Sequence, residues 1–218
     1  MDTVTTLRRI DGTGKTITTF VVFEASAALE TMQPGEVLEI VTDEFEPFEA
    51  DIAAWCTATG NVLELSERTA TGHRFLVEKG PRLANGARFA MVISGAGLLE
   101  LLSPLGFALG AALEGMQVDL YFQGPAVKVL TRGFRPKMPG WARPFTRFAS
   151  AGMTKAGHIP AQEKLTQLQS LGANIYVCGG SLAPFKVSRE DFMFDDLQIV
   201  EYLTFMSIMN DADVQLYV

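Results

Sequence analysis

The sequence contains few residues of the types that bind metals or form disulfides. Its 218 residues include two cysteines, Cys56 and Cys178, and two histidines, His73 and His158. The cysteines form no CxxC motif, and the spacing of these four residues matches no zinc site, so we expect no metal and no cofactor. Two free thiols are typical of a reducing compartment, and we expect a cytoplasmic protein. His73 is predicted to lie on the surface of a strand, and His158 in a loop.

A signal-peptide pattern and an uninterrupted membrane-spanning run are also missing. The N-terminal residues 1–9 lack the basic-then-apolar order of a signal peptide. The most apolar window, residues 89–113, has Glu100 as its one charged residue, but Ser94-Gly-Ala-Gly97 and Ser103-Pro104 interrupt it. A buried strand followed by a buried helix explains this window, although its length would permit a membrane helix. Peripheral contact with a membrane stays open.

Acidic residues are missing between Leu120 and Gln162. The basic residues of this segment are Lys128, Arg132, Arg135, Lys137, Arg143, Arg147 and Lys155. Residues 1–83 have the opposite balance, fourteen acidic and seven basic residues, which accounts for the net charge of −7 of the whole chain. The basic segment either attracts an anion, an acidic partner or an acidic membrane surface, or forms a solvated loop. No nucleic-acid recognition motif accompanies it, so we expect no nucleic-acid partner.

A stretch of turn-forming residues, Lys79–Gly86, separates two different patterns of predicted elements. The first pattern predicts a domain over residues 1–82, built as a two-layer α+β sandwich. Its predicted elements are a strand near 7–10, a helix over 20–32, a strand over 37–41, a helix over 50–59 and paired strands over 62–68 and 73–78.

The second pattern predicts a domain over residues 86–218, in which strands and helices alternate. The predicted strands are 88–93, 118–122, 175–177 and 214–218, and the predicted helices are 97–114, 161–171 and 197–210. Strands separated by helices indicate a parallel α/β sheet with right-handed crossovers. The basic segment forms an insertion in this domain, at about residues 124–160.

Cys178 is the strongest candidate for a reactive residue. It follows the predicted buried strand and precedes Gly179-Gly180-Ser181, which we predict to be a turn at the C-terminal end of that strand. Ligands gather at such strand ends in open α/β sheets, and backbone N–H groups there favour a thiolate. We predict that Cys178 is catalytic and that Gly179, Gly180 and Ser181 bind a substrate or anion. A buried core thiol is the alternative for Cys178, and packing is the expected role of Cys56.

Residues 5–80 resemble the TusA/SirA-like sulfur-carrier domains. The similarity lies in Met32-Gln-Pro-Gly-Glu36, in Asp51-Ile52 and Trp55-Cys56-Thr57, and in the last strand, Phe75–Gly80. Those carriers have a reactive cysteine in a Cys-Pro-x-Pro motif at the start of their first helix. In this chain that position falls at Ile17 or Thr18, so the resemblance implies a domain that docks or stabilises but does not carry sulfur there.

From Arg88 onward the chain resembles the DsrE family, and most closely a subfamily with a long basic insertion. The insertion corresponds to Pro136–Met153, and Leu168–Ser181 matches the helix, strand and cysteine of that subfamily. The last helix and strand match through Glu201-Tyr202-Leu203 and residues 211–218. This resemblance implies a flavodoxin-like parallel α/β sheet. One departure is Gly179-Gly180, which replaces bulkier residues after the cysteine.

The two resemblances together imply a fusion protein of sulfur trafficking. It would carry sulfane sulfur as a persulfide on Cys178 and pass it by thiol exchange, with sulfur donor and acceptor proteins as partners. They also imply a homo-oligomer, a trimer or hexamer, with the apolar helix 97–113 as a suitable interface. Whether the protein is an enzyme stays open.

Two other functions stay open beside sulfur transfer. In one, the chain is a non-catalytic scaffold or ligand-binding module, and Cys178 is a core thiol. In the other, it is a peripheral membrane adaptor that uses the aromatic residues of the insertion. These aromatic residues are Phe134, Trp141, Phe145 and Phe148.

Overall fold

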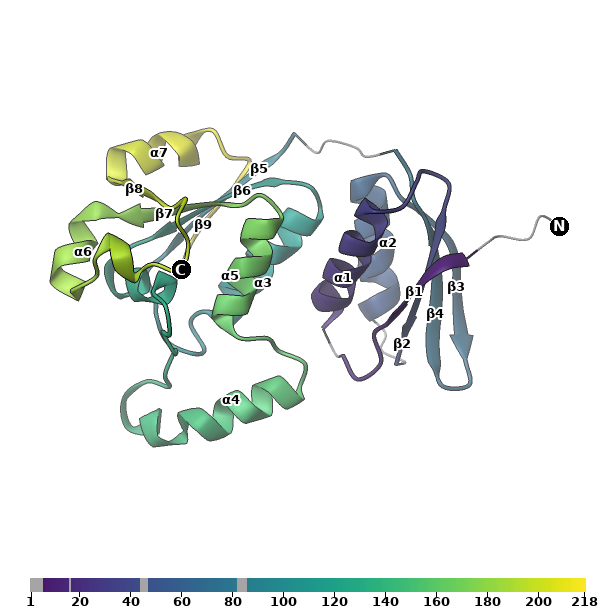
Figure 1. Cartoon of the computed structure of the whole chain (residues 1–218), viewed down its shortest axis with the longest axis horizontal. Helices are drawn as coiled ribbons and strands as arrows, with labels where there is room; N and C mark the ends of the chain where they lie inside the picture. The colour runs from purple at the N-terminus through teal and green to yellow at the C-terminus, as the bar shows by residue number, and fades with distance from the viewer. Residues whose placement is uncertain (1–5, 16, 44–46, 82–85) are drawn as a thin grey trace. The chain divides into compact units, whose positions relative to one another are not determined.

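The computed structural model of the chain describes residues 6–15, 17–43, 47–81 and 86–218 (Figure 1). The chain divides into two compact units, one made mainly of Met1–Asn85 and the other mainly of residues 86–218. The predicted boundary falls at residues 82–86, of which residues 82–85 lie outside the described part, so it stays a prediction.

The first unit is a four-stranded sheet covered by two helices. Its elements, in chain order, are β1 (Thr6–Asp11), α1 (Thr18–Glu30), β2 (Val37–Thr42), α2 (Pro47–Thr59), β3 (Val62–Thr69) and β4 (Gly72–Glu78). The strand order is β1-β2-β4-β3, with β1 parallel to β2 and the other pairs antiparallel. The two helices lie side by side against one face of the sheet (Figure 1). This is the predicted two-layer α+β sandwich.

The buried face of this sheet follows the two-residue alternation of strands. Ile40 pairs with Phe75 and Leu38 with Val77, and all four side chains are buried. His73 was predicted to lie on the surface, but it is buried because it shares this face. Its ring stacks on Phe75 with the ring centroids 4.4 Å apart, and its Nε2 lies 3.0 Å from the Ser66 Oγ.

The second unit is a five-stranded parallel sheet of the flavodoxin-like α/β class, as predicted. Its strands are β5 (Arg88–Ile93), β6 (Gln117–Phe122), β7 (Asn174–Cys178), β8 (Gln198–Val200) and β9 (Val214–Tyr217). Its α-helices are α3 (Leu102–Leu113), α4 (Thr146–Lys155), α5 (Ala161–Ser170), α6 (Gly179–Phe185) and α7 (Tyr202–Asn210). The strand order is β8-β7-β6-β5-β9, and every pair is parallel.

The strand order puts α7 on its own side of the sheet. Strands β5 to β8 follow one another in one direction, whereas the last crossover returns from β8 to β9 at the opposite edge. Right-handed crossovers therefore place α7 on the face opposite α3 and α5, as Figure 1 shows. Phe205 of α7 packs there against side chains of β5, β6 and β7, and these side chains are Ala90, Val92, Tyr121, Tyr176 and Cys178.

Three segments of this unit differ from the predictions. The helix predicted over 97–114 begins at Leu102 in the structure, as α3, and residues 97–101 precede it as a bridge and turn. Residues 179–181 form the first turn of helix α6 and not a turn that leaves the strand. The helix predicted over 197–210 is divided into the edge strand β8 and helix α7, with Glu201 as the N-cap between them. Pairing of β8 with β7 supplies backbone hydrogen bonds that a local sequence pattern does not reveal.

The basic insertion contains both buried and exposed parts. It begins with the 3-10 helix η1 (Gly124–Leu130), in which four apolar residues are buried. It continues with the 3-10 helix η2 (Gly140–Phe145) and with α4, neither of which buries a residue. Helix α4 stands away from the sheet (Figure 1). The insertion is therefore anchored at its start and exposed in its middle.

Within the described residues, no helix combines the length and the apolar character needed to span a bilayer. The same part of the chain holds no group of three or more Cys, His, Asp or Glu side chains arranged to bind a metal ion.

Candidate functional site

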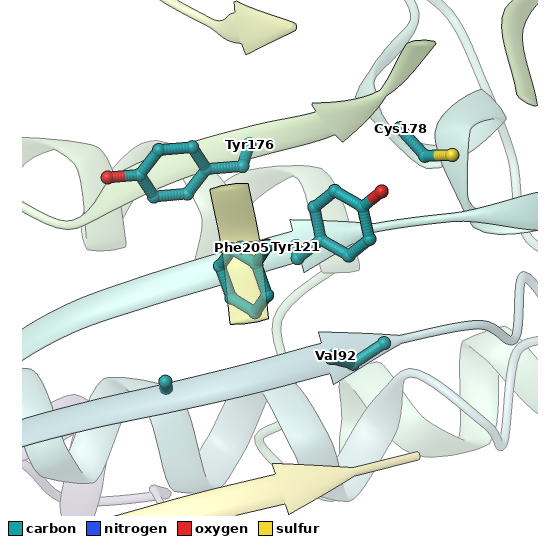
Figure 2. Close-up of a cluster of buried hydrophobic side chains, with 6 residues drawn as sticks. Val92, Tyr121, Tyr176, Cys178 and Phe205 are labelled. Carbon is teal, nitrogen blue, oxygen red and sulfur yellow. The ribbon is translucent and has the colours of Figure 1, made fainter. Parts of the chain in front are cut away.

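Cys178 is the last residue of β7 and lies at the C-terminal edge of the parallel sheet. Its side chain is on the α7 face, in the cluster with Tyr121 and Phe205 (Figure 2). The residue is only 1% exposed. The predicted position at a strand end is therefore observed, but the thiol is covered by its neighbours.

Tyr121, from the adjacent strand β6, directs its hydroxyl toward Cys178 (Figure 2). Its ring is fully buried and stacks on Phe205, with centroids 4.7 Å apart and planes inclined by 15°. The hydroxyl makes no hydrogen bond of standard geometry among the described residues. It lies close enough to the sulfur to act on it as a hydrogen-bond donor when the thiol ionises.

Ser181, in the first turn of α6, contacts the same sulfur. Its buried Oγ accepts a hydrogen bond of 2.8 Å from the Gly124 N–H, at the start of η1. With that lone pair engaged, the hydroxyl hydrogen is available to donate to Cys178 when the thiol ionises, and the Ser181 backbone N–H acts in the same direction on the pKa of the thiol. Gly124 has a φ of 55°, a conformation that favours glycine. The insertion thus begins by orienting a residue of the site.

Tyr202 begins α7 and approaches Cys178 from the solvent side. Its hydroxyl lies near enough to the sulfur to act as a donor when the thiol ionises, and its ring meets Tyr121 edge-on at a centroid distance of 6.3 Å. The residue is 59% exposed. Tyr202 is thus the most exposed of the three hydroxyl-bearing side chains around the thiol, which are Tyr121, Ser181 and Tyr202.

The hydrogen bonds outweigh burial in setting the acidity of the thiol. Burial alone raises the pKa of Cys178, but the donors from Ser181, Tyr121 and Tyr202 together bring that pKa below its ordinary value. The tyrosine hydroxyls show the opposite change. The pKa of Tyr121 is raised by burial and by its interaction with Cys178, and the pKa of Tyr202 by the same interaction with the sulfur. The arrangement favours a thiolate held by neutral hydroxyl donors.

The space beside Gly179 and Gly180 holds the carboxylate of Glu201. A Cβ on Gly179 would lie 2.7 Å from the Glu201 Oε1, and a Cβ on Gly180 would lie 3.7 Å from its Oε2. The absence of side chains at these positions makes room for Glu201. Of the three residues predicted to bind a substrate or anion, Ser181 reaches the sulfur, whereas the two glycines lie against a carboxylate. Their predicted role stays a prediction.

The sequence predictions missed Tyr121, Tyr202 and Glu201 as neighbours of the thiol. Tyr121 occupies an apolar strand, where a buried tyrosine is ordinary, and the other two belonged to a predicted continuous helix. The sequence did contain one signal for Tyr121: the predicted parallel sheet makes β6 a neighbour of β7, and neighbouring parallel strands bring their C-terminal residues together. Register decides which side chain faces the cysteine, and register comes from the fold.

The other residues considered from the sequence have structural positions. Cys56 is buried in α2, and burial raises the pKa of its thiol to about 12, which disfavours the thiolate at neutral pH. Ile17 and Thr18 stand at the start of α1, as Ncap and first helical residue. Lys128, in the basic insertion, reaches α6, where its Nζ lies 5.5 Å from the ring centroid of Phe185.

Comparisons with known proteins agree with this architecture. The family model described as "Sulfurtransferase TusA" matches residues 20–79, which begin just after Ile17 and Thr18. The model described as "DsrE/DsrF-like family" matches residues 87–217, more than half of the chain. Both are families of sulfur-relay proteins, which supports a role in sulfur trafficking.

Among solved structures, the ychN protein from E. coli matches with 15% sequence identity and a TM-score of 0.43. The match covers 61% of this chain and 99% of that chain. No curated protein gives a significant sequence match. The strand order, the position of Cys178 and the two family matches together identify the chain: it belongs to the DsrE/DsrF-like family and carries a TusA domain ahead of its DsrE-like domain.

Proposed function

We propose that the protein carries sulfane sulfur as a persulfide on Cys178 and passes it by thiol exchange to a partner protein. The observation that carries this proposal is the convergence of three hydroxyl groups on one sulfur at the C-terminal end of β7. These hydroxyl groups belong to Tyr121, Ser181 and Tyr202, and they lower the pKa of the thiol. A thiolate is the form that attacks a sulfur–sulfur bond.

The exchange requires no cofactor and no net oxidation. The Cys178 thiolate attacks the outer sulfur of a donor persulfide, so a new sulfur–sulfur bond forms on Cys178 and the bond in the donor breaks. The donor leaves as a thiolate, which takes up a proton according to its own pKa. In the second step an acceptor thiolate attacks the outer sulfur, and Cys178 leaves as a thiolate. A low pKa of Cys178 speeds this departure, because a more acidic thiol is a better leaving group.

The N-terminal unit has a different role in this proposal. No cysteine stands at Ile17 or Thr18, and Cys56 is buried with a pKa near 12, so the unit offers no second thiolate. We propose that it docks donor or acceptor proteins. We also propose a cytoplasmic location, because thiols stay available for exchange in a reducing compartment.

A homo-oligomer, a trimer or hexamer, forms part of the proposal. Segment 97–113, the interface expected from the sequence, contains helix α3 and buries much of its apolar surface in the core, including Leu101, Leu105 and Leu109. Helix α7 and strand β9 instead expose large apolar side chains. Beside Tyr202, which lies over the thiol, these side chains are Leu203, Met206, Val214 and Tyr217, and the last four form the apolar surface. We propose this apolar surface as the interface, because exposed apolar patches mark association sites.

The test is intact-mass analysis after incubation with a persulfide donor. The full chain, Cys178→Ser and Cys56→Ser are compared, and each sample is measured again after reduction. We expect the mass of one or more sulfur atoms to be added to the wild type and to Cys56→Ser, to be lost on reduction and to be absent from Cys178→Ser. Gain retained by Cys178→Ser, or no gain in any sample, would contradict the proposal.

A non-catalytic scaffold is the second candidate, and the 1% exposure of Cys178 favours it. In this case Cys178 is a core thiol, and docking is the function of the whole chain. The two candidates differ in one measurement, which is alkylation of Cys178 in the folded protein. In a carrier, Cys178 reacts with the alkylating reagent at neutral pH while the protein stays folded, so its reaction is faster than unfolding. In a scaffold, Cys178 reacts only as fast as the protein unfolds.

Peripheral membrane contact is favoured by the exposed aromatic side chains of the insertion. Trp141 is 87% exposed and Phe148 is 83% exposed, and Phe145 lies edge-on to Trp141. Basic residues surround them, among them Arg143 and Arg147. Aromatic side chains combined with basic ones are suited to the interface of an anionic membrane. We propose that the insertion brings the sulfur carrier to such a surface.

A further inference from the structure

The Tyr121 hydroxyl is a buried polar group without a standard hydrogen-bond partner among the described residues. Burying a hydroxyl without a hydrogen bond costs free energy, because the group loses its bond to water and gains none in return. A phenylalanine would fill the same volume and keep the stacking on Phe205, which lies 4.7 Å away between centroids. Stability alone therefore does not explain the hydroxyl at this position.

The neighbouring tyrosine gives the contrast. Tyr176 lies on the same face of the sheet, in β7, and its ring also meets Phe205, at 5.5 Å. Its hydroxyl points away from Cys178 (Figure 2) and donates to Asp119 Oδ1 at 3.3 Å. Tyr176 thus has an ordinary structural partner, whereas the Tyr121 hydroxyl has none of standard geometry among the described residues and is directed toward Cys178.

We propose that Tyr121 is a positioning residue whose hydroxyl donates to the Cys178 sulfur anion and holds it ready for exchange. Its hydrogen bond becomes complete when the thiol ionises, because a thiolate accepts hydrogen bonds far more strongly than a thiol does. The buried hydroxyl therefore contributes little to the stability of the protein with a neutral thiol and stabilises mainly the thiolate form. This inference deepens the proposed function and rests on it only for the transfer step.

The other groups that face the sulfur are less suited to this role. Ser181 shares its hydroxyl with the Gly124 N–H, and Tyr202 is mostly exposed, so water competes for its hydroxyl. Glu201 carries a negative charge that opposes an anion nearby, and its field also raises the pKa values of both Tyr121 and Tyr202. Tyr217 acts on Tyr202 from β9. Tyr121 combines a position in the central strand β6 with ring stacking on Phe205 and full burial.

The test compares Tyr121→Phe with Tyr176→Phe in the full chain. The rate of Cys178 alkylation is measured against pH, with the labelled peptide identified by mass, and the free energy of unfolding is measured in parallel. For Tyr121→Phe we expect the apparent pKa of Cys178 to rise by about one unit, a tenfold smaller thiolate fraction at neutral pH, with stability unchanged or increased. For Tyr176→Phe we expect a loss of stability and an unchanged pKa of Cys178.

An unchanged pKa of Cys178 in folded Tyr121→Phe would overturn the inference, as would equal pKa changes in both variants. If Tyr121→Phe does not fold, 3-fluorotyrosine placed at position 121 replaces it. Its more acidic hydroxyl is a stronger donor and must lower the pKa of Cys178; no change would again overturn the inference. The persulfide test is separate from this one. If Cys178 gains sulfur but its pKa is unchanged in Tyr121→Phe, the proposed sulfur transfer is supported and the role of Tyr121 is refuted. If the pKa changes but no sulfur is gained, the role of Tyr121 is supported and the proposed sulfur transfer is refuted.

Discussion

The carboxylate of Glu201 lies against the backbone of Gly179, so closely that a Cβ on Gly179 would approach the Glu201 Oε1 to 2.7 Å. The two residues come from different elements, the first turn of α6 and the N-cap of α7. Their contact links the residue after Cys178 to the helix that brings Tyr202 over the sulfur. The glycine pair that departs from the pattern of related domains therefore has a local structural reason.

This contact predicts different effects for alanine at the two glycines. Gly180→Ala meets only ordinary van der Waals contacts, at 3.7 Å or more, and gains helix propensity, so we expect the free energy of unfolding to rise by up to about 1 kcal/mol. Gly179→Ala meets Glu201 and also Ile199 Cγ2 at 3.3 Å, so we expect it to be about 1 kcal/mol less stable than Gly180→Ala. Denaturant unfolding measures both. A difference that persists in a Glu201→Ala background would show that Glu201 is not its cause.

Tyr202 is predicted to control access to Cys178. Tyr202→Ala removes the ring that reaches the sulfur from solvent, so we expect a bulky maleimide to react at least about tenfold faster once rates are corrected for the thiolate fraction. Tyr202→Phe keeps the ring and loses one donor, so we expect a higher pKa of Cys178 and little change in the corrected rate. Mass-resolved alkylation over a range of pH separates the two effects. Equal corrected rates for the alanine variant and the wild type would refute this role.

Lys164 predicts a pH dependence of stability. Burial lowers the pKa of this lysine to about 8, and its Nζ donates to the Leu102 carbonyl at 2.9 Å. Because the folded pKa is below the unfolded value, the folded state loses this proton at lower pH than the unfolded state does. The stability that Lys164 contributes is therefore reduced below pH 8 and rises between pH 8 and about 10.5.

The measurement is the difference in unfolding free energy between the wild type and Lys164→Met. We expect this difference to shift in favour of the wild type by about 2–3 kcal/mol as the pH rises through that window. Because the two proteins share all other titratable groups, the pH dependence of those groups cancels in this difference. A difference that does not change with pH would show that the folded protein keeps the ammonium form without cost.

Membrane contact is predicted to depend on Trp141 and Phe148. We expect the double variant Trp141→Ser/Phe148→Ser to bind vesicles with anionic lipids about tenfold more weakly than the wild type, since it loses the exposed apolar area. Added salt should weaken the binding of the wild type, because the basic residues act through screened charges. Phe107→Ser in α3, where Phe107 is 67% exposed and lies outside both the insertion and the proposed oligomer interface, is the matched control and should bind like the wild type. Vesicle co-sedimentation measures all three, and equal binding by the double variant would refute the prediction.

The elements of the fold were predictable where local patterns are strong. Strand β5 was predicted at its observed residues, and α5, β4 and β7 within two residues at each end, because apolar runs bounded by glycine or proline have few other solutions. Prediction failed at Gly179–Ser181 and at β8, where the decisive contacts are remote. The hydrogen bond from the Gly124 N–H to Ser181 and the pairing of Val177 with Ile199 join segments far apart in the sequence.

The sequence by itself determined the two fold classes, the position of Cys178 at a strand end and the absence of a cysteine at the start of α1. These features depend on local periodicity and on residue identity, which any reader of the chain can see. Only the tertiary structure decided that Tyr121, Ser181 and Tyr202 surround Cys178 and that Glu201 lies beside Gly179. Strand register and crossover direction determine these contacts, because packing of the whole sheet selects which side chains from distant segments share one face.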